Sequence, residues 1–185
     1  MQAARGTPLS QPGKTGEESE PTHPTSSHRR IRLFATVAAV VYASDVASKI
    51  VVVRDLSGHE PISLLGGLLT LRLTRNPGAA FSTATGYTVL LTLVAIGVVI
   101  CVTRLAARLG STVWAVALGL LLGGALGNLT DRIFRSPGPL RGHVVDFLEL
   151  PHWPIFNLAD SAIVLGAALI TLQSLRGIHL DGRRS

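Results

Sequence analysis

The sequence predicts an α-helical integral membrane protein with four transmembrane helices and a small β-sheet outside the membrane. Hydrophobic residues make up 47% of the 185-residue chain and charged residues only 15%, which is more apolar than a soluble domain needs. Four apolar stretches are each about long enough, at roughly 1.5 Å per residue, to cross a hydrocarbon layer of about 30 Å. Polar segments rich in turn residues separate these stretches.

The N-terminal residues 1–28 are rich in Pro, Ser, Thr, Gly and charge, and they contain almost nothing to bury. We therefore expect a disordered tail. The apolar run that follows, at about 33–53, is too long for the core of a signal peptide, so we predict a retained first span. Asp45 and Lys49 interrupt this span four residues apart, on one face of a helix, where they can pair. Two interpretations stay open: an ion pair with Lys49 reaching the far surface, or a role in a functional site.

The segment 54–86 is polar and rich in turn residues. Within it, Leu69, Leu71 and Leu73 alternate with polar residues, and this period of two is typical of a half-exposed strand. We expect a small sheet outside the membrane, closed by the stretch 76–82, which contains a Pro-Gly turn.

Three further spans are predicted at about 87–103, 111–129 and 156–175. The second contains Cys101, which we interpret as a small core residue. The third has glycines along one face, which indicates close helix packing; they are Gly119, Gly123, Gly124 and Gly127. Asp131 and Arg132 are expected to end the third span.

Four spans place both termini on one side of the membrane, and the distribution of arginine predicts which side. The side with the termini is expected to be cytoplasmic, and its arginines are Arg29, Arg30, Arg32, Arg104, Arg108, Arg176, Arg183 and Arg184. The sheet would then be extracytoplasmic. The unusual polar residues near the spans all fall on that outer half: Asp45, Lys49, Asn76, Asn128, Asp131, Arg132, Asp146, Asn157 and Asp160.

Two aspartates in the stretch 142–161, Asp146 and Asp160, suggest chemistry at the outer membrane boundary. Desolvation and mutual repulsion raise the pKa of at least one carboxylate in such a pair, so the two share a proton. One can then take a proton from water while the other donates one to a carbonyl oxygen, which is acid-base hydrolysis of an amide. The non-catalytic alternative is that Asp160 caps a helix and Asp146 is a solvated loop residue.

Other functions fit the sequence less well. The histidines outside the tails are scattered, so we expect no metal and no cofactor, and no basic run interleaved with aromatics indicates nucleic acid. A serine-lysine protease using Ser44 or Ser48 with Lys49 stays open, although these spacings orient the side chains poorly. A non-enzymatic membrane protein that binds a lipid or an assembly partner is the remaining alternative.

Five motifs in order resemble those of lipoprotein signal peptidase, the bacterial type II signal peptidase. They are Asp45-Val-Ala-Ser-Lys49, Asn76-Pro-Gly-Ala-Ala-Phe-Ser82, Gly124-Ala-Leu-Gly-Asn-Leu-Thr-Asp-Arg132, Val144-Val-Asp-Phe147 and Phe156-Asn-Leu-Ala-Asp-Ser161. The resemblance spans residues 33–175. The N-terminal tail is longer than the family requires, the connection from Asp131 to Asp146 is stretched, and the loop from Asp146 to Asp160 is short.

The resemblance implies an aspartic endopeptidase of the bacterial cytoplasmic membrane with its active site at the outer face. Such enzymes remove the signal peptide from prolipoproteins just before a diacylglyceryl-modified cysteine. Asp146 and Asp160 would be the catalytic dyad, and Asp131 a structural residue paired with a nearby arginine. The residues that would support the site or hold the substrate are Asp45, Lys49, Asn76, Gly124, Asn128, Arg132, Asn157 and Ala159.

The predicted organisation is a disordered cytoplasmic tail at 1–28, a four-helix membrane peptidase domain at 29–176 and a basic cytoplasmic tail at 177–185. The expected partners are the prolipoprotein substrate and membrane lipids, and we expect a monomer.

Overall fold

The computed structural model describes residues 26–78 and 87–184, and within them it contains four long helices. These are α1 (Ser26–Leu56), α2 (Tyr87–Ala106), α3 (Thr112–Phe134) and α4 (Leu158–Leu175). All four are long and apolar enough to cross a membrane, which confirms the predicted number of spans in this part of the chain. The predicted tail lies outside the described residues up to position 25, and so do residues 79–82 of the predicted turn. Residues 26–28 were predicted to be disordered, but they form the start of α1. The three-part division of the chain stays a prediction.

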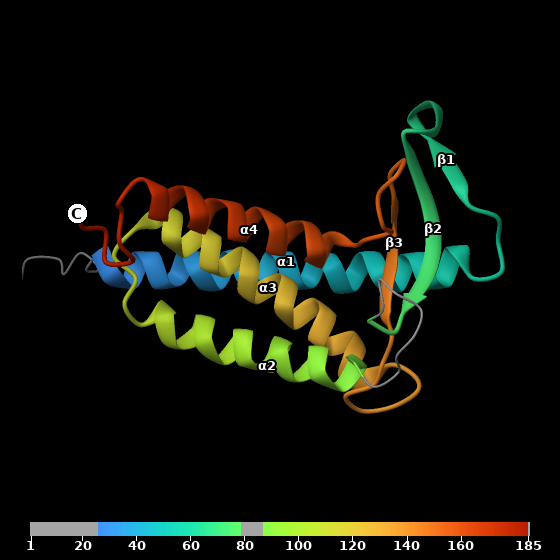
Figure 1. The fold of residues 1–185 in the computed structure, drawn as a ribbon, viewed down its shortest axis with the longest axis horizontal. Helices are drawn as coiled ribbons and strands as arrows, with labels where there is room; N and C mark the ends of the chain where they lie inside the picture. The colour runs from blue at the N-terminus through green and yellow to red at the C-terminus, as the bar shows by residue number, and fades with distance from the viewer. Residues whose placement is uncertain (1–25, 79–86, 185) are drawn as a thin grey trace, which may run out of the picture.

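Helix α3 is the centre of the bundle. In the apolar 18-residue segment of α3, 56% is buried inside the protein. In the corresponding segments of the other three helices, only 17–22% is buried. Figure 1 shows α3 crossing between α1, α2 and α4. Apolar side chains on the outward faces of the other helices are exposed, for example Val40, Leu93 and Val164. Such exposure is expected for surfaces that face lipid.

The glycines of α3 bring its backbone close to α1 and α4. A Cβ atom at Gly119 would lie 2.9 Å from the backbone oxygen of Phe34, and one at Gly123 would lie 2.7 Å from that of Ala38. On the α4 side, a Cβ at Gly124 would lie 2.5 Å from the backbone oxygen of Ala159. The predicted small-residue packing face is therefore confirmed.

A three-stranded antiparallel sheet of order β1-β2-β3 lies at one end of the bundle (Figure 1). Its strands are β1 (Ile62–Leu64), β2 (Leu69–Asn76) and β3 (Val144–Glu149), and a short 3₁₀ turn, η1 (Leu65–Gly67), joins the first two. The sheet packs on the end of α1 through Val52, Leu56, Val145 and Phe147, with Leu71 and Leu73 beside them. The pairing of β2 with β3 sets Thr74 opposite Asp146.

The predicted strand around 69–73 is confirmed, but β3 was not predicted. The first four residues of β3 are all buried, so the strand lacks the alternation of polar and apolar residues that reveals a half-exposed strand. Asp146 is therefore a buried strand residue rather than the solvated loop residue of the non-catalytic alternative.

Two further expectations were wrong. Helix α3 does not end at Asp131 and Arg132 but continues to Phe134, because the charge of Asp131 is paired inside the protein. Cys101 is exposed rather than a core residue, because α2 turns most of its surface away from the other helices.

The close contact at Gly123 predicts a loss of stability when a methyl group is added there. Because the nearest atoms include the backbone oxygen of Ala38, they cannot move aside cheaply, and Gly123→Ala should cost about 1–3 kcal/mol. The matched control is Gly97→Ala in α2, where an added Cβ meets nothing within 4 Å and helix propensity improves. Thermal unfolding in detergent should show a lower Tm for the first variant only. Equal Tm values for the two variants would contradict close packing of α1 on α3.

Candidate active site

Asp146 lies in the middle of β3 and is 3% exposed. Two amide side chains donate hydrogen bonds to its carboxyl group. The Nδ2 atom of Asn76 on β2 lies 2.9 Å from Oδ2, and the Nδ2 atom of Asn157 lies 2.6 Å from Oδ1. Burial raises the pKa of the Asp146 carboxyl to about 6; the negative charge of Asp160 also raises it, while the hydrogen bonds from Asn76 and Asn157 oppose the rise.

Asp160 lies in the first turn of α4 and forms a capping box with Asn157. The backbone N–H of Asp160 donates to Asn157 Oδ1 at 2.9 Å, and the backbone N–H of Asn157 donates to Asp160 Oδ2 at 3.2 Å. The other oxygen of Asp160, Oδ1, accepts a hydrogen bond of 2.8 Å from Asn128 Nδ2 on α3. The capping interpretation of Asp160 is thus confirmed. In this position Asp160 is half-buried, and its carboxyl group lies beside Asp146.

Asn157 links the two aspartates. Its side-chain nitrogen donates to Asp146, its side-chain oxygen accepts from the Asp160 backbone, and the residue is fully buried. The same nitrogen lies 3.1 Å from Asn128 Oδ1 and 3.3 Å from the backbone oxygen of Val145. One asparagine therefore fixes the start of α4 relative to β3, and with it the relative position of the two carboxyl groups.

Behind the aspartates lies a buried ionic network centred on Lys49 of α1. Lys49 Nζ is 2.7 Å from Asp45 Oδ2, 3.0 Å from Asp131 Oδ2 and 3.0 Å from Asn128 Oδ1. The predicted pairing of Asp45 with Lys49 is confirmed, but Lys49 is only 1% exposed and does not reach a surface. Asp131 also pairs with Arg135, as predicted for a nearby arginine.

Each carboxylate of this network holds the backbone just before one of the two candidate catalytic residues. Asp45 Oδ1 accepts a hydrogen bond of 3.0 Å from the N–H of Ala159, and Asp131 Oδ2 accepts one of 3.1 Å from the N–H of Val145. Gly127 makes room for Asp45, because a Cβ there would lie 2.4 Å from Asp45 Oδ2. The sequence did not assign these roles to Asp131, Val145 and Gly127, since they depend on tertiary contacts.

Arg132 is the cation that faces the aspartates without pairing directly with either. It is 8% exposed, and its Nη1 atom is buried with no hydrogen-bond partner among the described residues. A Cβ atom at Gly78 would lie 3.3 Å from Arg132 Nη2, so the guanidinium sits against the end of β2. The carboxylates of Asp146 and Asp160 are close enough to act on its charge.

A cleft of about 310 Å³ opens onto Asp146 from the sheet. Its walls come from the end of β2 and from the connection between β3 and α4, and they comprise Thr74, Arg75, Asn76, Pro77, Asp146, Pro154 and Ile155. The buried carboxyl group of Asp146 is thus reachable from outside. The described structure places all ten predicted site residues either in the aspartate network or directly against it.

Comparisons with known proteins show which family the chain belongs to. The family model described as signal peptidase (SPase) II matches residues 37–176. The chain is 54% identical over 166 residues to the lipoprotein signal peptidase of Rhodococcus jostii, covering 90% of this chain and 83% of that one. It is 49% identical over 179 residues to the lipoprotein signal peptidase of Mycobacterium tuberculosis, covering 96% and 88% of the two chains.

A solved structure titled as a bacterial membrane enzyme has the same fold, with a TM-score of 0.70 and 28% identity over 79% of this chain and 94% of that chain. The family match and these relatives show that the chain belongs to the signal peptidase II family of membrane proteases.

Proposed function

We propose that this protein removes signal peptides from diacylglyceryl-modified bacterial prolipoproteins, cleaving before the lipidated cysteine, with Asp146 and Asp160 as a catalytic dyad. Removal of a signal peptide from a prolipoprotein is the activity that its family membership supports. The observation that carries the mechanism is the bridge made by Asn157 between a buried strand aspartate and a helix-start aspartate. Membrane lipids would surround the bundle.

The two carboxyl groups have different surroundings, which suits a division of roles. Asp146 is the more deeply buried, and its raised pKa of about 6 favours holding the shared proton. Asp160 would act as the general base that takes a proton from the attacking water, while Asp146 donates its proton to the carbonyl oxygen. The resulting tetrahedral intermediate collapses when Asp146 takes back a hydroxyl proton and Asp160 protonates the leaving nitrogen as the C–N bond breaks.

Arg132 suits a role in holding the substrate backbone. A buried guanidinium nitrogen without a partner is costly, and a peptide carbonyl oxygen would satisfy it. Its position at Gly78 places it at the end of β2 that also forms the cleft beside Asp146. The substrate peptide would therefore lie along the open side of the sheet, across the dyad.

The orientation in the membrane is part of the proposal. The sheet and the start of α4 lie at one end of the bundle, and the start of α1 and the C-terminal end of the chain lie at the other (Figure 1). Asp146 is in strand β3 of that sheet, and Asp160 is in the first turn of α4. Eight arginines lie near the spans at that other end and six at the sheet end, and this modest excess favours the cytoplasmic side for both termini and the outer face for the dyad. A substrate anchored by two acyl chains would present its scissile bond near this depth.

The serine-lysine alternative is weakened by the position of Lys49. Its ammonium group is held by two carboxylates and an amide oxygen, so it is a poor candidate for a free base. Ser48 donates its hydroxyl to the backbone oxygen of Asp45 at 2.8 Å instead of to a base.

The dyad predicts that Asp146→Asn and Asp160→Asn each lower kcat by about 10³-fold or more, because each removes a proton-transfer step. Cleavage of a diacylglyceryl-modified prolipoprotein by purified protein in detergent measures this. Ser48→Ala is the matched control and should retain activity within about twofold. Cleavage that survives both aspartate changes, or that is lost in Ser48→Ala alone, would remove the aspartic mechanism.

The raised pKa of Asp146 predicts the pH dependence of the free enzyme. The active form carries one proton on the dyad, and Asp146 loses that proton as the pH rises through about 6. The value of kcat/KM should therefore fall above about pH 6, approaching tenfold per pH unit. A profile measured from about pH 5 to about pH 8 checks this.

Histidine is the other side-chain type that ordinarily titrates in this range. A variant with His59, His143 and His152 changed to Gln serves as the control, and it should keep the same profile. A profile that flattens in this variant would assign the pH dependence to histidine rather than to the dyad.

The role of Arg132 predicts that Arg132→Lys lowers kcat/KM about 10- to 100-fold, chiefly through KM, because lysine keeps the charge but loses the planar set of donors. Arg135→Lys, at the residue that directly follows α3, is the matched control; it keeps its ion pair with Asp131 and should change kcat/KM by less than about threefold. Equal effects of the two substitutions would show that Arg132 does not contact the substrate.

A further inference from the structure

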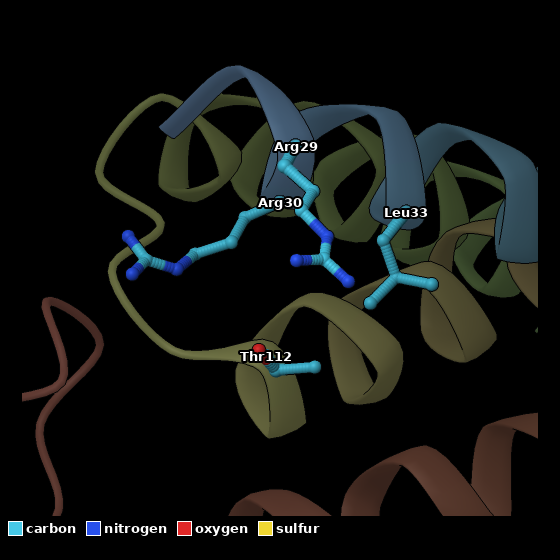
Figure 2. Close-up of a pocket in the computed structure, with 4 residues that line it drawn as sticks. All are labelled: Arg29, Arg30, Leu33 and Thr112. Atoms are coloured by element: carbon cyan, nitrogen blue, oxygen red, sulfur yellow. The ribbon is translucent and has the colours of Figure 1, made fainter. Parts of the chain in front are cut away.

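The end of the bundle opposite the sheet contains a second cavity, which the proposed catalytic site does not use. It has a volume of about 340 Å³ and is lined by Arg29, Arg30 and Leu33 of α1 and by Thr112 at the start of α3. Figure 2 shows the side chains of both arginines reaching from α1 toward the start of α3 and the segment that leads into it. Among the residues that the structure describes, no acidic side chain lines this cavity.

The two arginines have no ionic partner in residues 26–78 and 87–184. The first turn of α1 contains no acidic residue either. Two guanidinium groups thus lie at one cavity, and no carboxylate in the described part of the chain pairs with either of them. Because like charges repel, such a pair is stabilised by an anion that both can contact.

The start of α3 adds to this positive charge. The 23-residue helix begins at Thr112, and its N-cap residue, Ser111, makes no side-chain capping bond. The positive end of the helix dipole therefore points toward the same region, and the Thr112 side chain brings a hydroxyl group. Guanidinium groups, a hydroxyl and a helix start together form a donor set that suits a phosphate group.

The cavity also lies at the depth of lipid headgroups. Helix α1 has 31 residues, so at roughly 1.5 Å per residue it is about 46 Å long and exceeds a hydrocarbon core of about 30 Å. Its ends therefore reach the headgroup region. Leu33 gives the cavity an apolar side, and Ile31 beside it is 40% exposed. A ligand with a phosphate and adjoining acyl chains matches these surroundings.

We propose that this cavity, named here the Arg29/Arg30 pocket, binds the phosphate headgroup of an anionic phospholipid. The two guanidinium groups contact the phosphate, Thr112 and the start of α3 complete the donor set, and the acyl chains lie along the apolar surface beside Leu33. This site differs from a general attraction of basic residues to the membrane surface, because it depends on two particular arginines rather than on the number of charges.

The test measures lipid binding by the full-length protein in nanodiscs that contain equal amounts of phosphatidylglycerol and phosphatidylcholine. Native mass spectrometry of the released protein counts the retained lipids of each kind. One basic residue near an anionic lipid is worth about fivefold in affinity, so R29Q/R30Q should weaken retention of phosphatidylglycerol about thirtyfold. R104Q/R108Q is the matched control: it removes the same charge from exposed arginines near the same end of the bundle, and it should retain the preference.

Three outcomes would overturn the proposal. An equal loss in both double variants would assign the preference to surface charge alone. An unchanged preference in R29Q/R30Q would show that the pocket holds no lipid phosphate. Displacement of the lipid by millimolar glycerol phosphate would show that the pocket takes a free phosphate ester instead. Prolipoprotein cleavage in pure phosphatidylcholine should be unchanged in both double variants, which verifies that each is folded.

Discussion

The buried ammonium group of Lys49 is the constraint on which the rest of the site depends. It lies 2.7 Å from Asp45 and 3.0 Å from Asp131, with no access to water. Charges at this depth persist only when they are paired. The two paired carboxylates in turn accept the backbone N–H groups of Ala159 and Val145. Because these residues directly precede the two dyad aspartates, a single cation fixes the backbone positions of both.

The carboxylates of the site are of two kinds, which differ in the side chains that contact them. Asp45 and Asp131 have cationic partners in Lys49 and Arg135. Asp146 and Asp160 form no ion pair within residues 26–78 and 87–184, and their side-chain partners are the amides of Asn76, Asn128 and Asn157. A neutral donor orients a carboxyl group while stabilising its charge less than a cation would. This difference suits the proton exchange that is proposed for Asp146 and Asp160.

The sequence was most informative where a pattern reflects local chemistry. Apolar length predicted the four spans, the spacing of Asp45 and Lys49 predicted their ion pair, and the glycines predicted the close face of α3. It failed where tertiary contacts override local pattern. Strand β3 shows no alternation of polar and apolar residues because its first four residues are all buried. Helix α3 continues past Asp131 because Lys49 of α1 pairs with the Asp131 carboxylate. The site residues were identified by resemblance to a family, since spacing alone does not show that β3 and α4 meet.

Burial bears both on the reactivity proposed for Asp146 and on the number of side chains that surround the two aspartates. The desolvation that raises the pKa of Asp146 also makes any unpaired polar atom nearby costly. Each oxygen of Asp146 therefore has a donor, and so does each oxygen of Asp160. Arg132 is the exception, with one buried nitrogen left without a partner in the described residues. In a network otherwise this complete, the unsatisfied donor supports the proposed hydrogen bond from Arg132 to the substrate backbone.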